Sequence, residues 1–425
     1  MIDRMEWIVL VIATFLVIGR SVDGLDLLNK SIQTRTDVTN QASLSLDIRD
    51  MRLACRSRNA GEALNIYKNG KNSPLSNSGG NKRNFVSFLS SADDLSSMAW
   101  IFHLLGHLDS SDRNDRDPIM EQILQKNALT TDIMIRNLFT SAEKNDNNEE
   151  DCLLAVEATV ATQLFFQTSQ SLWKGVWKCA RSSQEGYDPN ADSRGNEDVD
   201  YIDEFIAFWV GLGTDHENAL YNLSRQAALD FNTMDPLIPN SSKVHSNIRT
   251  WYEEASGVAL SQPNACTPEN PQTAGHLWNL ANLIQTQMYI PLIQKLIEAL
   301  ATANQKKIKV YAQAIIPQLV QISNKGYDSI KELLLDTTPT SDFNQRITQL
   351  QSFFPLLGIT CADIGGISSL VPVCQDPPLK LLTSYTPRSN VQQVNHMETP
   401  IYFEERWTKT LKPILFIFIF SFILF

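Results

Sequence analysis

The sequence of 425 residues lacks the features of a nucleic-acid-binding protein or a transporter. Its 36 basic residues are outnumbered by 47 acidic ones, which gives a net charge of −11. A protein that wraps a polyanion needs a concentrated basic face, and the sequence has no such cluster, so nucleic acid is excluded as a partner. Between the two ends, no apolar run reaches the roughly 18 residues that cross a bilayer, which excludes a polytopic channel.

Motifs for catalysis and for cofactor binding are also missing. The sequence has no GxSxG, no phosphate-binding GxxxxGK, no CxxC pair and no Cys and His arrangement typical of a nucleophile. Gly211-Leu-Gly213 follows a helical pattern instead of a strand and is not a dinucleotide fingerprint. These absences favour a protein without a cofactor and without enzymatic activity.

The pattern of residues 1–24 is typical of a secretory signal peptide. Trp7 to Gly19 is a continuous apolar stretch of the length expected for a signal, and the small residues after it suit cleavage behind Ser21 or Gly24. The segment before it carries more acidic than basic residues, which departs from the usual pattern. An uncleaved N-terminal anchor therefore stays open as the alternative.

A second apolar segment ends the sequence. As a helix, Ile414 to Phe425 would reach only about 18 Å, whereas Trp407 to Phe425 can cross the hydrocarbon core of about 30 Å. A terminal apolar run is also typical of a lipid-anchor signal, although no small residue stands at the usual attachment spacing. Residues 407–425 are thus a transmembrane helix, a lipid-anchor signal or a buried terminal segment. The first two make the membrane a partner through this tail and place the bulk of the chain outside the cell.

The cysteines agree with export. An even number of cysteines in a secreted chain suggests disulfides, and buried free thiols are the alternative. Cys152 and Cys179 lie at opposite ends of one helical pattern, about 40 Å apart if it is unbroken, so they should pair with other partners. Cys361 and Cys374 bracket a Gly-Gly turn, which favours a local bridge. The six candidates are Cys55, Cys152, Cys179, Cys266, Cys361 and Cys374.

Three sequons are candidates for N-glycosylation, at Asn29, Asn222 and Asn240. Asn240 lies in a Pro-rich loop and is the most accessible of the three, whereas Asn222 falls in a helical pattern. Their number is close to what chance gives, so they agree with secretion without establishing it.

Apolar residues recur at helical spacing through most of the chain, which predicts the all-α class. We expect a disulfide-stabilised, antiparallel helical bundle or array as ectodomain, followed by a stalk and a hydrophobic tail. The predicted organisation is a signal peptide at 1–24, the ectodomain at 25–371 with a flexible loop at 69–84, the stalk at 372–406 and the tail at 407–425. The predicted helices cover about 44–53, 85–108, 117–144, 152–177, 202–231, 244–260, 272–335 with interruptions at Pro291 and Pro317, and 343–354.

Two segments have weak metal-binding signatures. His103 and His107 share a helix face at i, i+4 spacing, but Leu104 stands where the HExxH motif needs a glutamate, so exposed helix histidines are the simpler interpretation. Asp188, Asn190 and Asp192 match the first positions of a calcium loop, whose required glycine and bidentate glutamate are then missing. Neither segment predicts a standard metal site.

The leading functional hypothesis is a cell-surface recognition or adhesion protein that acts by binding a protein ligand or co-receptor. It follows from the topology and from the lack of catalytic motifs. Two alternatives stay open: an extracellular helical carrier of an apolar ligand, and a membrane-tethered extracellular hydrolase that uses the histidine pair.

Overall fold

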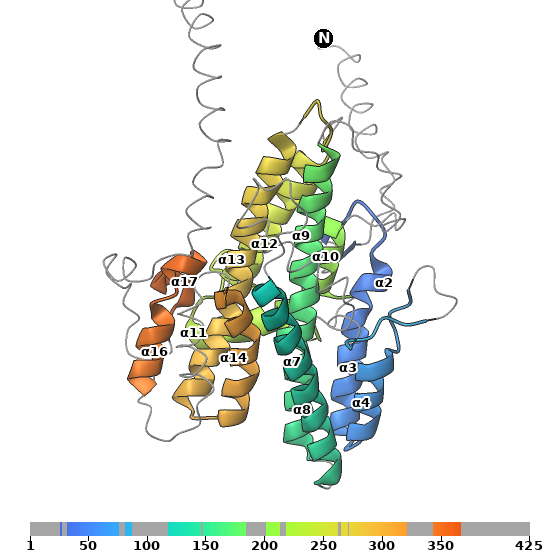
Figure 1. Cartoon of the computed structure of the whole chain (residues 1–425), viewed down its shortest axis with the longest axis vertical. Coiled ribbons are helices and arrows are strands. Elements are labelled where there is room, and N and C mark those ends of the chain that lie inside the picture. The colour runs from blue at the N-terminus through green and yellow to red at the C-terminus, as the bar shows by residue number, and fades with distance from the viewer. Residues whose placement is uncertain are drawn as a thin grey trace, which may run out of the picture.

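The chain folds almost entirely into α-helices, as its apolar periodicity predicts (Figure 1). A computed structural model describes residues 26–27, 32–75, 81–86, 118–145, 148–183, 201–212, 218–261, 265–270, 272–320 and 343–366. Within these residues the only sheet is the two-stranded antiparallel pair β1 (Asp26–Leu27) and β2 (Ile32–Gln33). The all-α prediction is confirmed.

The helices in chain order are α2 (Thr39–Ala42), α3 (Leu44–Arg56), α4 (Ala60–Asn69), α7 (Pro118–Lys144), α8 (Glu149–Ala158), η1 (Thr159–Leu164), α9 (Phe165–Ser182), α10 (Tyr201–Val210), α11 (Leu220–Phe231), α12 (Lys243–Glu253), η3 (Glu254–Ala259), α13 (Gln272–Ala301), α14 (Gln305–Val320), α16 (Phe343–Gln351), η4 (Pro355–Leu357) and α17 (Cys361–Ile364). The segments η1 and η3 are π-helical, and η4 is a 3₁₀ turn.

One hydrophobic core joins these helices. The long helices α9 and α13 pack on each other, and α10, α12 and α14 cover them. The hairpin α3–α4 packs against α7 and α8 at one side of the molecule, visible in blue and teal in Figure 1. Buried aliphatic and aromatic side chains from all of these helices form a single cluster, so the described body is held together mainly by apolar burial.

Helix starts follow the capping rules where the sequence offers a capping side chain. The side chain of Asn148 accepts hydrogen bonds from the amides of Glu150 and Asp151, and the acidic first turn of α8 complements the positive end of its dipole. The amide of Glu62 donates to the Asn59 side chain in the same way at the start of α4.

Two prolines do not interrupt their helices, contrary to prediction. Pro291 lies inside α13, which runs unbroken from Gln272 to Ala301, and α14 likewise continues through Pro317. A proline removes one backbone hydrogen bond and crowds the preceding turn. In α13 the residues around Pro291 are buried on every side of the helix, and this packing offsets the local cost.

The predicted helix over 202–231 is two helices. The backbone at Gly211 has φ of +77°, a conformation that ends α10 and that L side chains rarely adopt. The chain resumes as α11 at Leu220. Apolar spacing continues across the break because both helices face the same core, so periodicity alone concealed it.

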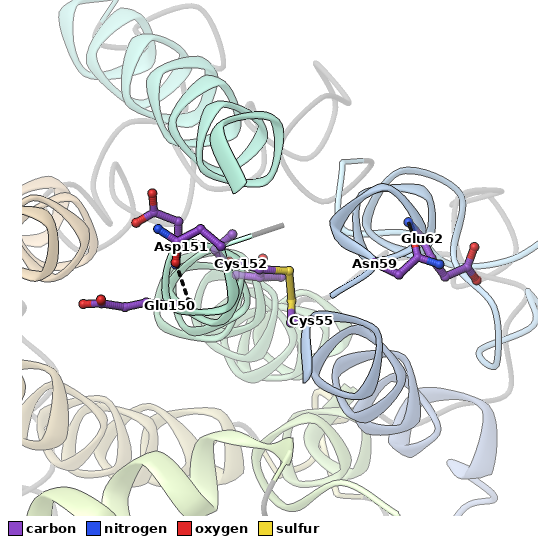
Figure 2. Close-up of a disulfide and its surroundings, with 9 residues drawn as sticks. Cys55, Asn59, Glu62, Glu150, Asp151 and Cys152 are labelled. Carbon is purple, nitrogen blue, oxygen red and sulfur yellow. Dashed lines mark hydrogen bonds between the residues drawn. A yellow bond between two sulfur atoms is a disulfide. The ribbon is translucent and has the colours of Figure 1, made fainter. Parts of the chain in front are cut away.

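Two disulfides fasten distant segments. Cys55 of α3 is bonded to Cys152 of α8 with 5.4 Å between their Cα atoms, and Figure 2 shows this bridge between the two helices. Cys179 near the end of α9 is bonded to Cys266 with a Cα distance of 4.6 Å. As expected, Cys152 and Cys179 have separate partners. Cys361 is also disulfide-bonded, while Cys374 lies outside the described residues.

The two arms of the segment predicted as the loop 69–84 are bonded to each other. The Leu75 amide donates to the Asn81 carbonyl at 3.0 Å, and the Arg83 amide donates to the Ser73 carbonyl at 2.7 Å. Pro74 and Lys82 form an isolated antiparallel bridge between the two arms. Residues 76–80 lie outside the described part.

Candidate functional site

The metal signatures found in the sequence lie outside the described residues. This applies to His103 and His107 and to the segment 188–192, as it does to the sequon at Asn29. Within the part of the chain that the structure describes, no group of three or more His, Cys, Asp or Glu side chains is placed to hold a metal ion.

The end segments 1–24, 372–406 and 407–425 likewise fall outside the described residues. Among the helices that are described, none combines the length and the apolar character needed to cross a bilayer.

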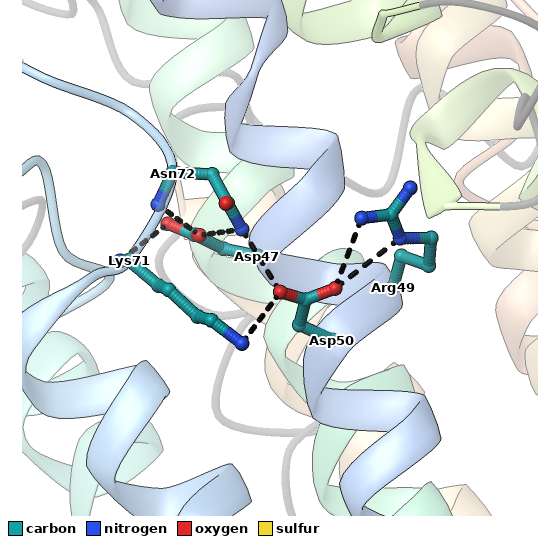
Figure 3. Close-up of polar contacts among 5 residues, drawn as sticks. All are labelled: Asp47, Arg49, Asp50, Lys71 and Asn72. Atoms are coloured by element: carbon teal, nitrogen blue, oxygen red, sulfur yellow. Dashed lines mark hydrogen bonds and ion pairs between the residues drawn. The ribbon is translucent and has the colours of Figure 1, made fainter.

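A pair of carboxylates on consecutive turns of α3 is the first candidate for chemistry (Figure 3). Asp47 is fully buried and accepts hydrogen bonds from the amides of Lys71 and Asn72, at 3.2 and 2.6 Å, and from the Asn72 side chain at 2.8 Å. Asp50 lies nearer the surface, 2.9 Å from Lys71 Nζ and 3.1 Å from a guanidinium nitrogen of Arg49. These contacts fasten the segment after α4 to α3.

The two carboxyl groups differ in acidity. Burial raises the pKa of Asp47 above its ordinary value, and the hydrogen bonds from Asn72 and Lys71 offset only part of this effect. Burial acts in the same direction on Asp50, but the hydrogen bonds from Lys71, Asn72 and Arg49 outweigh it and lower the pKa of Asp50. Asp50 therefore ionises at lower pH than Asp47.

We expect Asp50→Asn to remove part of the acid sensitivity of folding. A lowered folded-state pKa gives stability that is present above the unfolded-state value of about 3.9 and is lost as pH falls through the folded pKa. Because Lys71 is half exposed, its ion pair with Asp50 contributes at most about 1 kcal/mol to the free energy of unfolding. Urea unfolding between pH 3 and pH 6 checks it, with Glu143→Gln, a change at an exposed site on α7, as the charge-matched control.

Asp47 should change the stability of the protein with pH in the opposite direction to Asp50. Because its pKa is raised in the folded protein, stability falls as pH rises from the unfolded-state value through the folded pKa. Carboxyl-carbon NMR titration separates the two groups. Titration of Asp47 before Asp50 as the pH rises would contradict the assignment.

Two adjacent buried acids on α10 form a second polar centre. Asp203 Oδ2 accepts from the amides of Arg35 and Thr36, at 2.7 and 2.8 Å, and from the Thr36 hydroxyl at 3.0 Å. Its Oδ1 accepts from the Tyr252 hydroxyl at 2.8 Å and from Ser256 at 3.4 Å. Burial, followed by the charge of Asp203, raises the pKa of Tyr252, so this hydroxyl keeps its proton and remains a donor.

Glu204 points to a different set of partners. Its Oε1 lies 3.2 Å from Arg83 Nη1 in a buried ion pair, and its Oε2 accepts from the Ser171 hydroxyl at 2.9 Å. The two acids therefore hold separate segments against α10: the chain around residue 35 and the segment that carries Arg83. Both carboxylates have internal partners and serve as anchors of the fold.

Sequence reasoning missed these acids, although a signal existed. Asp203 and Glu204 follow one another near the start of α10, a helix whose other residues are almost all apolar. Charges in such a helix have to be buried with it, and buried charges need partners. Their partners lie between 33 and 168 positions away in the sequence, so which ones they have depends on how distant segments pack and is not visible in the spacing.

The loop between α11 and α12 presents apolar side chains to solvent. Leu237 is 87% exposed and Ile238 is 39% exposed. The Asp235 side chain accepts hydrogen bonds from the amides of both residues, at 2.8 and 3.2 Å. The loop is closed by the Asp235 amide, which donates to the Ser241 carbonyl at 2.8 Å. We call residues 235–242 the apolar loop. Unlike the buried acids, it offers side chains that another molecule can reach.

Comparison with known proteins identifies a family. The model of the family described as Fea1, low iron-inducible periplasmic protein, matches residues 10–235, which is more than half of the chain. No curated protein and no solved structure matches. The family description agrees with the two disulfides, since such bonds persist in compartments outside the cytosol. The chain therefore belongs to the Fea1 family of low iron-inducible periplasmic proteins and is an extracellular protein.

Proposed function

We propose that this protein acts outside the cell as a non-catalytic binding protein when iron is scarce, and that it works by engaging a protein partner at the cell surface. The observation that carries this proposal is the family match over residues 10–235, whose description joins low-iron induction to a periplasmic location. Retention at the surface by residues 407–425, behind a stalk at 372–406, is part of the proposal.

The geometry supports a recognition role in two ways. The disulfides fasten α3 to α8 and α9 to the segment around Cys266, so the described helices offer a stable scaffold for surface contacts outside the cell. The carboxylates of Asp47, Asp203 and Glu204 are engaged by donors from the chain itself. Contacts with a partner would then fall on the outer faces of the helices and on the loops that join them.

The test combines location, induction and requirement in the organism that makes the protein. Cells are grown with and without iron, and intact cells are labelled with an impermeant reagent, with and without phospholipase treatment. We expect more labelled protein under low iron, and release by the lipase would identify a lipid anchor in place of a transmembrane helix. Crosslinking on intact cells should add the mass of a partner to the protein.

Two outcomes would contradict the proposal. One is an amount of surface protein that does not change with iron supply. The other is normal growth under low iron of cells that lack the protein, together with no crosslinked species.

A further inference from the structure

We propose that Asn240 carries an N-linked glycan and that the first sugar of this glycan packs on Leu237 and Ile238. The inference rests on the geometry of the apolar loop and goes beyond the binding role proposed above. It needs only export through the secretory route, which the signal peptide predicted at residues 1–24 would direct and which the periplasmic description of the family supports.

The loop displays its apolar side chains in a fixed arrangement. Both amides that follow Pro236 are held by the Asp235 carboxylate, and the pKa of Asp235 is lowered by its hydrogen bonds with Ser246 and with these amides. Met234 and Ser242 pair across the base of the loop. Leu237 and Ile238 are therefore exposed to water in a closed turn. Covering their apolar surface would lower the free energy of the folded protein.

Asn240 stands on the same turn with its side chain exposed. The Ser241 amide donates to the Ile238 carbonyl at 3.2 Å and closes a β-turn with Pro239 and Asn240 at its centre. Asn240 has φ of +60°, which asparagine tolerates at the third position of a turn better than most residues do. The Tyr221 hydroxyl donates to the Asn240 carbonyl at 3.1 Å and fixes the backbone there.

The two described sequons differ in the room they offer. Asn222 lies in the first turn of α11 with a half-buried side chain, so a glycan there would have to displace its surroundings. At Asn240 the side chain is exposed at the tip of a turn, so a glycan meets no packed neighbour. The structure thus selects Asn240 over Asn222.

The modification must precede folding. The hydroxyl of Ser242, the third residue of the sequon, is fully buried, accepts from the His245 amide at 3.1 Å and lies 2.9 Å from the Ser224 hydroxyl. In the unfolded chain, Asn240 Nδ2 attacks C1 of the first N-acetylglucosamine of a lipid-linked oligosaccharide pyrophosphate. The C1–N bond forms, the C1–O bond to phosphate breaks, Nδ2 loses one proton and the lipid pyrophosphate leaves.

The sugar then lies close to apolar partners. Leu237 and Ile238 precede Asn240 by three and two residues, which limits their Cα separation to about 11 Å even in an extended chain, and the turn shortens it. A hexose ring has an apolar face of C–H groups that gains from covering exposed aliphatic side chains. The glycan would therefore cover the tip and stabilise the turn that carries it.

Site occupancy is tested on the full chain secreted from a eukaryotic host that glycosylates. Peptide N-glycosidase treatment in heavy-oxygen water, followed by mass spectrometry of peptides, should place the label at position 240 and not at 222. Asn240→Gly keeps the φ of the turn and should remove one glycan mass, whereas Asn222→Gln should leave the attached glycan mass unchanged. A folded, secreted protein with unmodified Asn240 would overturn the proposal and would leave the binding role untouched.

Packing of the sugar is tested by melting. Native enzymatic removal of the glycan from the wild type should lower Tm by about 1–2 °C, the shift that corresponds to roughly 1 kcal/mol when the unfolding entropy is about 2.1 cal/mol/K per residue and the folded body has about 250–350 residues. In the double variant Leu237→Ser, Ile238→Ser the same treatment should change Tm by less than a third as much. Equal shifts in the two proteins would show that the sugar does not use these side chains.

Discussion

Replacing both Cys55 and Cys152 with alanine is expected to lower the free energy of unfolding by about 4–5 kcal/mol. The two residues are 97 positions apart, and a crosslink over a loop of this length restricts the unfolded chain by that amount in the loop-entropy model. Equilibrium unfolding in guanidinium chloride measures the change, and the dependence on denaturant should rise because the unfolded chain is freer to expand.

The second disulfide supplies a matched comparison. Cys179 and Cys266 are 87 positions apart, so the loop terms of the two bridges differ by only about 0.1 kcal/mol. Cys55 and Cys152 are both fully buried, whereas Cys266 is half-buried. Alanine at the first pair therefore also leaves cavities in the core, and we expect its loss to exceed that of the second pair. If the two double variants lose equal stability, the whole loss comes from the greater freedom of the unfolded chain and none from cavities in the core.

Asp203→Ala is expected to cost about 3–5 kcal/mol, the second large effect. The change removes the acceptor of the Arg35 and Thr36 amides and of the Tyr252 hydroxyl. Each buried donor left without its acceptor costs roughly 1–3 kcal/mol, and the half-buried position of the two amides lets water replace part of the loss.

Amide hydrogen exchange makes this prediction specific. The amides at positions 35 and 36 should lose protection in Asp203→Ala, because their acceptor is absent even while the rest of the body stays folded. Tyr252→Phe is the matched control. It removes one hydrogen bond to the same carboxylate, should cost about 1 kcal/mol and should leave the two amides protected. Unchanged exchange at 35 and 36 in the alanine variant would contradict the role of Asp203 as an anchor.

The helices were predictable where their signals are local. The cap at Asn148 and the stripe that begins at Pro118 can be recognised from neighbouring residues alone, and the structure has both α8 and α7 there. The points at which a helix ends or continues were harder to predict from the sequence. At Gly211 the backbone turns because of its positive φ, and at Pro291 the helix continues because surrounding packing outweighs the lost hydrogen bond.

The cysteine pairs show more clearly what sequence spacing can and cannot predict. Helix length correctly separated Cys152 from Cys179, because that argument needs only the rise per residue. Their true partners, Cys55 and Cys266, depend on which helices meet across the core. The partners of Asp203 and Glu204 were hidden for the same reason. A local bridge between Cys361 and Cys374 stays a prediction.

The two crosslinks also bear on how the protein would survive proteases outside the cell. A single peptide-bond cleavage anywhere between Cys55 and Cys152, the tied arms after α4 included, leaves both fragments covalently joined through sulfur. The same holds for a cut between Cys179 and Cys266. A nicked molecule would thus keep its full mass on a non-reducing gel and would separate into pieces only after a thiol is added.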